Sequence, residues 1–276
     1  MNSSSSQNPL EKETTSFRNI SYSKRDIFYR KAKEEGYRAR SVYKLKEIHY
    51  NYNILSNSSK FVDLCAAPGS WSQMLRILTK SNKEAKIVSV DIQDIVPIEG
   101  VNIIKGDITR QDTIEKILSH FNNEKVDVII FDGAPDVSGL IDIDMYMQVE
   151  LIIFSLVIVM KLLRKGGKFV GKMFKVGARE DYDEVVSGGL YSVKSDFYYE
   201  KVKVLFDNVF YFKPSSSRVT SHETYLICEG FDIESDNVRK VIEDSSMEDI
   251  FDFENKIRDD DTKNFLRYLV QGSYSI

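Results

Sequence analysis

The stretch FVDLCAAPGSWSQML, residues 61–75, constrains the fold of this chain more than any other. Its apolar run Phe61–Ala67 is typical of a buried parallel strand, and the Pro-Gly-Ser triplet that follows favours a sharp turn before a helix beginning at Trp71. At such a turn Gly69 lets the backbone approach a small ligand, and the first N–H groups of the helix lack partners inside it. Because most glycine turns after strands only reverse the chain, this stretch alone leaves a cofactor loop and a plain turn both open.

Apolar runs that end in an acid recur after this stretch. Three more predicted strands each end at or beside an aspartate: Lys86–Ile92 with Asp91, Val101–Ile108 with Asp107, and Val126–Phe131 with Asp132. Ligands of open parallel sheets bind beyond the carboxyl ends of the strands, so we expect these aspartates to gather around Gly69. An acid after the second strand commonly accepts a hydrogen bond from a ribose diol. Any one of them could instead only cap the following turn.

The second half of the chain extends the same α/β pattern. We predict a long apolar helix at Ile143–Leu163 and a lysine-containing strand at Lys168–Phe174. A polar, glycine-containing insertion (Val176–Lys194) and a short helix (Ser195–Phe206) follow. An antiparallel strand pair, Val209–Lys213 with Thr224–Glu229, closes the sheet. The helix contains a stretch of twelve residues, Val149–Met160, that is nearly all apolar and too short to cross a bilayer. Lys172 lies inside an apolar run, where a lysine is either directed to solvent or buried and used, as catalytic bases are.

Charge is distributed very unevenly along the chain. Residues 24–46 contain nine Lys and Arg against three Asp and Glu, interleaved with four aromatic residues, Phe28, Tyr29, Tyr37 and Tyr43. This composition favours phosphate contact and base stacking over the alternative of a solvated helix face. From Glu229 onward thirteen acids face six bases, so the tail carries −7 and the rest of the chain +3 of the total −4.

These shifts in composition suggest three segments. Residues 1–23 are predicted to be a disordered leader without signal-peptide or transit-peptide character, residues 24–230 one domain, and residues 231–276 an acidic tail. The amphipathic part of the tail, around Leu266 and Leu269, needs this domain or a partner to pack against. Because the leader has no targeting character we expect a cytoplasmic protein, with the nucleus as the alternative, and two cysteines in predicted strands suit such a reducing compartment. Few histidines and cysteines are present to bind a metal.

Five stretches of the sequence carry a resemblance to a known family. In chain order they read GYRARSVYKLKEI, VDLCAAPGSWSQ, FDGAPDVSG, GGKFVGKMFK and KPSSSRVTSHETYLI. Together they resemble the FtsJ/RrmJ family of S-adenosylmethionine-dependent RNA ribose 2′-O-methyltransferases, over about residues 24–230. The resemblance implies a Rossmann-like methyltransferase fold, a mostly parallel seven-stranded sheet with helices on both faces.

The same resemblance implies functional residues. A Lys-Asp-Lys-Glu catalytic tetrad falls on four residues of this chain: Lys44, Asp132, Lys172 and Glu223. S-adenosylmethionine would be held at Gly69, Trp71, Asp91, Asp107 and Asp132, and no metal is expected. The ribose hydroxyl is a poor nucleophile, so Lys172 would accept its proton. Lys44 would favour proton loss from Lys172, whereas Asp132 and Glu223 would oppose it, and the sequence leaves the balance open.

Within the family, SKRDIFYRKAKEEGYRARS and CAAPGSWSQ are most similar to the eukaryotic branch that methylates the tRNA anticodon loop. Enzymes of that branch work with accessory subunits that select the nucleotide, so the amphipathic part of the acidic tail is a candidate docking element. The insertion after Lys175 and the acidic tail depart from the family pattern. Ribosomal RNA as substrate, a non-catalytic RNA-binding module, and a methyltransferase for small molecules or proteins are the alternatives.

Overall fold

A seven-stranded sheet forms the centre of the computed structural model, which describes residues 27–134, 141–174, 202–218, 221, 223–267 and 269. The strand order is β3-β2-β1-β4-β5-β7-β6. The strands are β1 (Lys60–Leu64), β2 (Lys86–Asp91), β3 (Asn102–Lys105), β4 (Val126–Phe131), β5 (Leu163–Phe174), β6 (Phe206–Phe212) and β7 (Glu223–Phe231). The first five pair in parallel, and β7 runs antiparallel to both β5 and β6. The predicted mostly parallel, Rossmann-like sheet is therefore confirmed.

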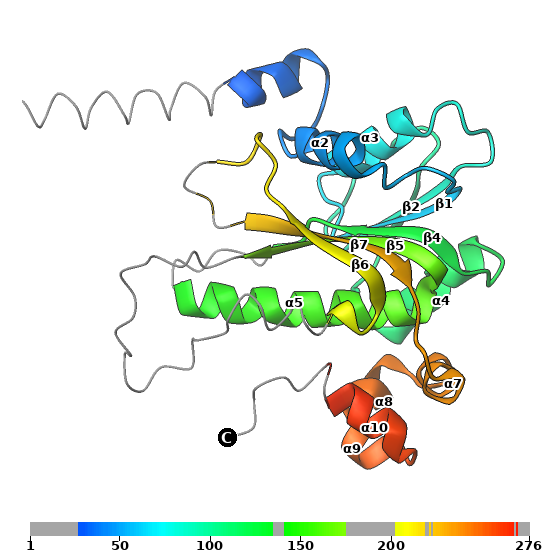
Figure 1. Ribbon diagram of the computed structural model, residues 1–276. Helices are drawn as coiled ribbons and strands as arrows, with labels where there is room; N and C mark the ends of the chain where they lie inside the picture. The colour runs from blue at the N-terminus through cyan, green and yellow to red at the C-terminus, as the bar shows by residue number, and fades with distance from the viewer. Residues whose placement is uncertain are drawn as a thin grey trace, which may run out of the picture.

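Helices cover both faces of the sheet (Figure 1). Residues 27–34 are helical, and α2 (Val42–Tyr52) and α3 (Ser70–Leu78) lie over one face. The helices α4 (Gln111–His120) and α5 (Ile141–Leu162) lie over the other. In α5 the buried residues from Leu156 to Met160 belong to the larger hydrophobic cluster, whereas α2 and α3 enclose a second one. No helix among the described residues is long and apolar enough to span a bilayer.

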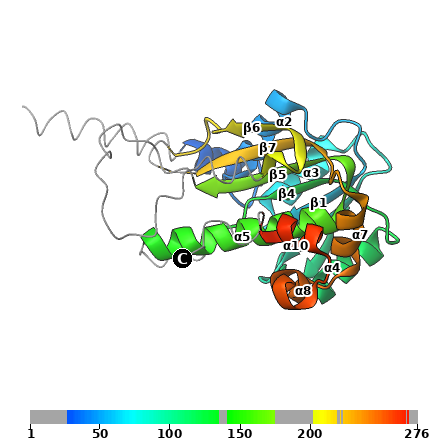
Figure 2. The same cartoon turned by 60° about the horizontal axis from the view of Figure 1, so that its bottom comes forward.

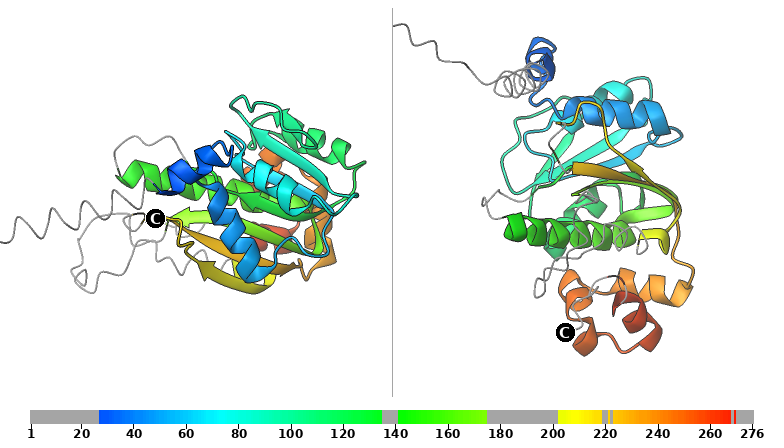
Figure 3. Two further views of the ribbon diagram at one scale, coloured as in Figure 1. Left: turned by 90° about the horizontal axis from the view of Figure 1, so that it is seen from above. Right: turned by 60° about the vertical axis from the view of Figure 1, so that its left-hand side comes forward.

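The chain after β7 folds into a group of short helices, here called the C-terminal helical region. It comprises α7 (Asp236–Asp244), α8 (Met247–Phe251), α9 (Phe253–Lys256) and α10 (Asp260–Leu266). Figures 1, 2 and 3 show this region beyond α5, so that α5 lies between it and the sheet. Leu266 and Leu269 are buried in the same hydrophobic cluster as α5. The amphipathic stretch was expected to pack against either this domain or a partner, and Leu266 and Leu269 pack against this domain.

Serine and aspartate N-caps, together with acids in the first turns, help the short helices of this region to form. Ser235, Ser246 and Asp259 each accept a hydrogen bond from a backbone N–H three residues further on. Such N-caps satisfy donors that have no partner inside the helix and stabilise it by about 1 kcal/mol each. Acids in the first turn of α8 and α10 also interact favourably with the helix dipole.

Several predicted boundaries differ from the observed ones for local reasons. The first strand ends at Leu64 and not at Ala67, because Cys65 adopts a left-handed backbone conformation with φ of 54°. The strand β5 begins immediately after α5, five residues before the predicted Lys168, and has a register shift against β4. The predicted leader 1–23, insertion 176–194 and most of the short helix 195–206 lie outside the described residues.

Candidate active site at the carboxyl edge of the sheet

The turn between β1 and α3 lies at the carboxyl edge of the sheet and is held there by Asp91. One carboxylate oxygen of Asp91 accepts the N–H of Ala67 at 2.8 Å, and the other accepts the N–H of Gln93 at 2.8 Å. Asp91 is 8% exposed, and a carboxylate can accept more than these two hydrogen bonds. The predicted approach of this acid to the glycine turn is thus observed, and the contact is with the loop backbone.

Gly69 has φ of +101°, a conformation that favours glycine. A Cβ atom added here would lie 2.7 Å from Nη1 of Arg38, which donates to the carbonyl oxygen of Pro68 at 2.9 Å. Nη2 of Arg38 donates to the carbonyl oxygen of Pro97 at 3.1 Å. Arg38 therefore ties the glycine turn to the loop after β2. Glycine is favoured at this position by its positive φ, whereas the end of the Arg38 side chain could shift to admit a Cβ atom.

Asp107 and Trp71 occupy different parts of this edge. One oxygen of Asp107 accepts both the backbone N–H and the hydroxyl of Thr109, at 2.9 and 2.8 Å, so it organises the turn after β3. Trp71 is 2% exposed, and its indole N–H donates to the carbonyl oxygen of Ser41 at 2.9 Å. A ring enclosed in this way leaves the backbone at the start of α3 as the part of Trp71 that a cofactor could reach.

The four residues of the predicted tetrad form two lysine–acid pairs. Nζ of Lys44, on α2, is 2.7 Å from a carboxylate oxygen of Glu223, the first residue of β7. Nζ of Lys172, on β5, is 3.3 Å from Oδ1 of Asp132 and donates to its backbone carbonyl oxygen at 2.9 Å. Both lysines are less than 10% exposed. Side chains from distant parts of the sequence thus meet in two buried ion pairs.

Tyr225 connects these pairs, and the sequence reasoning missed it. It is fully buried and lies opposite Lys172 in the register of β5 and β7. Its hydroxyl donates to Oδ1 of Asp132 at 2.6 Å, and its ring centroid is 5.9 Å from Nζ of Lys44. One signal could have identified it: Tyr225 is two residues after Glu223 on one strand, so both side chains face the same side of the sheet.

The pKa values in this cluster reflect both burial and charge. Burial alone would raise the pKa of Glu223, but the adjacent ammonium of Lys44 outweighs it and the net pKa is lowered. Glu223 is therefore ionised at neutral pH. Burial and the negative charge of Asp132 raise the pKa of Tyr225 well above its usual value, so its hydroxyl remains a donor. Residues described by the structure include no cluster of ligands suited to a metal ion.

The aromatic residues of the basic segment differ in their exposure. Tyr43 is buried, and Phe28 and Tyr37 are partly buried against the hydrophobic cluster of α2 and α3. Tyr29 is half exposed, with Nζ of Lys33 at 5.0 Å from its ring centroid. Tyr29 is therefore the most accessible of the four rings, and base stacking by this segment stays a prediction.

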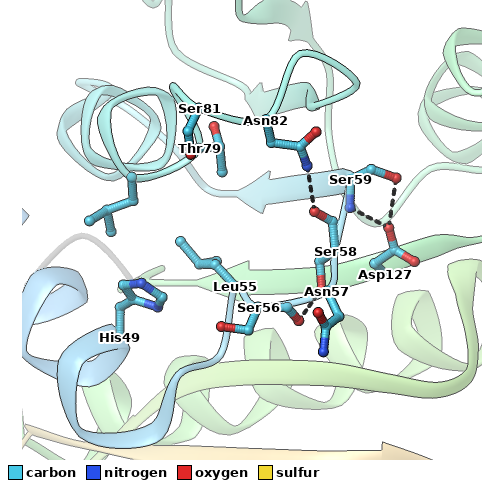
Figure 4. Close-up of a pocket in the computed structure, with 11 residues that line it drawn as sticks. His49, Leu55, Ser56, Asn57, Ser58, Ser59, Thr79, Ser81, Asn82 and Asp127 are labelled. Carbon is cyan, nitrogen blue, oxygen red and sulfur yellow. Dashed lines mark hydrogen bonds between the residues drawn. The ribbon is translucent and has the colours of Figure 1, made fainter.

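A polar cavity of about 400 Å³ lies at the opposite edge of the sheet, where β1 and β4 begin (Figure 4). Asp127 accepts the backbone N–H groups of Ser59 and Lys60 there, at 2.7 and 2.8 Å. Asn82 donates to the carbonyl oxygen of Ser58 at 2.9 Å. These bonds fix the loops that lead into the strands, and the cavity is separated from the lysine–acid pairs by the length of the strands.

Comparison with known proteins gives one family. The family model of FtsJ-like methyltransferases matches residues 37–231. A Dictyostelium discoideum protein provisionally named a tRNA (cytidine(32)/guanosine(34)-2′-O)-methyltransferase is 47% identical over 211 residues, 75% of this chain and 72% of its own length. The Schizosaccharomyces pombe protein with the same activity in its name is 40% identical over 216 residues, covering 75% of this chain and 70% of its own. Across the first six curated relatives the match spans 56 to 72% of their length.

A solved structure agrees with this result. The crystal structure of a Plasmodium falciparum protein described as a ribosomal RNA methyltransferase superposes with a TM-score of 0.57 and 26% identity. The alignment covers 71% of this chain and 98% of that protein.

Proposed function

Because the chain belongs to the FtsJ-like methyltransferase family, we propose that it transfers a methyl group from S-adenosylmethionine to a ribose 2′-hydroxyl group of RNA. The observation that carries this proposal is the pair of buried ion pairs, Lys44 with Glu223 and Lys172 with Asp132, at the carboxyl edge beside the glycine turn. Ligands of open α/β sheets bind at this edge.

The residues around the turn fit S-adenosylmethionine. Gly69 brings the backbone close, the first turn of α3 contains no acid, and its unpaired N–H groups suit the carboxylate of a methionine moiety. Asp91 and Asp107 follow β2 and β3, where carboxylates commonly accept hydrogen bonds from the ribose and base of a nucleoside. Trp71 would contribute its backbone at the start of α3, and Asp132 would border the reacting centre. When bound, S-adenosylmethionine supplies a methyl group already activated by the sulfonium charge.

The chain's own residues then deprotonate and orient the acceptor. Lys172, as a neutral amine, accepts the proton of the 2′-hydroxyl group at Nζ. The backbone carbonyl oxygen of Asp132 holds that nitrogen by a hydrogen bond, and the carboxylate of Asp132 lies 3.3 Å away. Lys44 is held by Glu223 and contributes positive charge next to the oxygen that gains negative charge. Holding the hydroxyl in line with the methyl group contributes further, since effective molarities reach about 10⁵ M or more.

We propose tRNA as the substrate, at the anticodon loop, because the names of the similar proteins give positions 32 and 34 of tRNA. These positions carry different bases, which favours an accessory protein subunit that selects the nucleotide over base recognition by the site itself. The solved relative described as a ribosomal RNA methyltransferase makes ribosomal RNA the second candidate. A cytoplasmic location is proposed as well, since Cys65 and Cys228 are free thiols.

The test is methylation of two RNAs by the purified protein. A tRNA transcript and a ribosomal RNA fragment are incubated with S-adenosylmethionine, and the digested nucleosides are analysed by mass spectrometry. We expect 2′-O-methylnucleosides in the tRNA, no product with Lys172→Ala, and normal product with the control Lys168→Ala, four residues earlier on β5. Product in the ribosomal fragment alone would select the second candidate. Cofactor binding without methylation of either RNA, also in the presence of cell extract, would indicate an RNA-binding module.

A further inference from the structure

Tyr225 lies between the two lysine–acid pairs and contacts a group of each. Its hydroxyl donates to Oδ1 of Asp132 at 2.6 Å, and its ring faces Nζ of Lys44 at 5.9 Å. The same ring packs against Trp71, with the ring centroids 5.6 Å apart and an interplanar angle of 33°. Since Tyr225 is fully buried, solvent cannot compete for any of these contacts.

A tyrosine hydroxyl in a fully buried position is costly unless it is hydrogen-bonded, and phenylalanine would fill nearly the same volume. The oxygen that accepts the hydroxyl of Tyr225 is also the oxygen nearest to the ammonium of Lys172, at 3.3 Å. One carboxylate oxygen of Asp132 is therefore held by a neutral donor on one side and by a lysine on the other. The phenol fixes the direction in which the carboxylate faces the lysine.

We propose that Tyr225 is a positioning residue for methyl transfer: its O–H group orients the carboxylate of Asp132 so that Nζ of Lys172 faces the ribose 2′-oxygen. This inference rests on the proposed function. In the reaction the 2′-oxygen forms a bond to the methyl carbon, the carbon–sulfur bond breaks with its electron pair staying on sulfur, and the hydroxyl proton moves to the lone pair of Lys172 in its neutral amine form. Tyr225 touches none of the reacting atoms and acts through Asp132.

The hydrogen bond also affects how Asp132 attracts Lys172. Donation by the phenol spreads part of the negative charge of Asp132, so the carboxylate attracts the ammonium less strongly. The charged groups that face Tyr225 are Lys44 from α2, Asp132 after β4, Lys172 on β5 and Glu223 at the start of β7. Of these, Asp132 is the one to which the phenol donates, so loss of the hydroxyl should act mainly on Asp132 and Lys172.

The test is Tyr225→Phe, which keeps the ring and its packing and removes the hydroxyl. We expect kcat for methyl transfer to fall about tenfold, which corresponds to one buried hydrogen bond, with little change in the Kd for S-adenosylmethionine. The matched control is Tyr52→Phe, eight residues after Lys44 on α2, whose ring packs on Phe210 and Phe212.

A purely structural role would raise the Kd for S-adenosylmethionine as well as lower kcat, and that result would overturn the inference. A double-mutant cycle gives a second readout: in an Asp132→Asn background, Tyr225→Phe should have almost no further effect on the rate. Additive losses would contradict the inference even if the single variant were less stable. If the wild-type protein methylates RNA but Tyr225→Phe matches it in rate, the inference fails while the proposed function stands.

Discussion

Two buried lysines on neighbouring elements serve two regions of this molecule in different ways. Lys172, on β5, contacts the carboxylate and carbonyl oxygens of Asp132 at the carboxyl edge of the sheet. Lys161, at the end of α5, donates to the backbone carbonyl oxygens of Ile242, at 3.0 Å, and Ser245. Both are nearly inaccessible to water. Burial of a lysine therefore does not identify a catalytic residue, and its partners are the more informative observation.

Lys161 shows why a shifted pKa is also insufficient. Burial, with a smaller contribution from Lys125, lowers the pKa of Lys161 to about 8, a value suited to a general base. Its amine nevertheless faces the end of α7, where carbonyl groups lack partners within the helix. Lys161 thus attaches the C-terminal helical region to α5, and its pKa is a consequence of that attachment.

The largest expected effect separates the two lysines by activity. Lys172→Met should reduce the rate of methyl transfer by about 1,000-fold or more, because proton acceptance and orientation are lost together. Lys161→Met should leave the rate within about twofold, since its contacts lie on the far side of α5. Single-turnover transfer of a labelled methyl group to tRNA measures both. Equal losses of rate in the two variants would contradict the conclusion that Lys172 is catalytic and Lys161 is structural.

The second prediction concerns stability and pH. A lysine with a lowered pKa in the folded protein is neutral there between pH 8 and 10.5, whereas in the unfolded chain it is still charged. The unfolded state binds more protons in this window, so stability rises with pH. Relative to Lys161→Met, the wild-type protein should gain about 3 kcal/mol of unfolding free energy across the window.

Urea unfolding of both proteins at several pH values measures this difference, and the other titrating groups cancel in the subtraction. A constant difference from pH 7 to pH 10 would show that Lys161 is not buried as described. Such a result would remove the contrast between the two lysines.

The smallest expected effect concerns the loops beside Lys172. Arg38→Ala removes two hydrogen bonds that join the glycine turn to the loop after β2. We expect the Kd for S-adenosylmethionine to rise by about fivefold, equivalent to about 1 kcal/mol, with a rate at saturation close to that of the wild type. Arg110→Ala, which removes an exposed ion pair with Asp112, is the control. Isothermal titration calorimetry measures the affinity, and equal values for the two variants would contradict the assigned role of Arg38.

The sequence predicted the parts of this fold that depend on local patterns. Apolar runs gave the first four strands, of which the second to fourth end at or beside an aspartate, and the position of Asp91 beside the glycine turn followed from parallel topology. The strand ends were less predictable. The end of β1 depends on the left-handed conformation of Cys65, which glycine would adopt more readily and which no apolar pattern reveals.

The candidate site was only partly predictable, because it depends on contacts between distant segments. The resemblance indicated Lys44, Asp132, Lys172 and Glu223, and the structure brings each lysine to an acid. Tyr225 was missed because a tyrosine in an apolar strand looks like any core residue until its register opposite Lys172 is known. The packing of Phe28, Tyr37 and Tyr43 against the cluster of α2 and α3 was not predicted either, because rings beside many cations look like candidates for base stacking.

The most direct test of the central claim is a crystal structure of the protein with a short RNA and an unreactive analogue of S-adenosylmethionine. The account predicts that the ribose 2′-oxygen lies about 3 Å from Nζ of Lys172, within hydrogen-bond distance, and faces the donor carbon. A 2′-oxygen bound more than about 6 Å from that amine, too far for a bridging water, would contradict it.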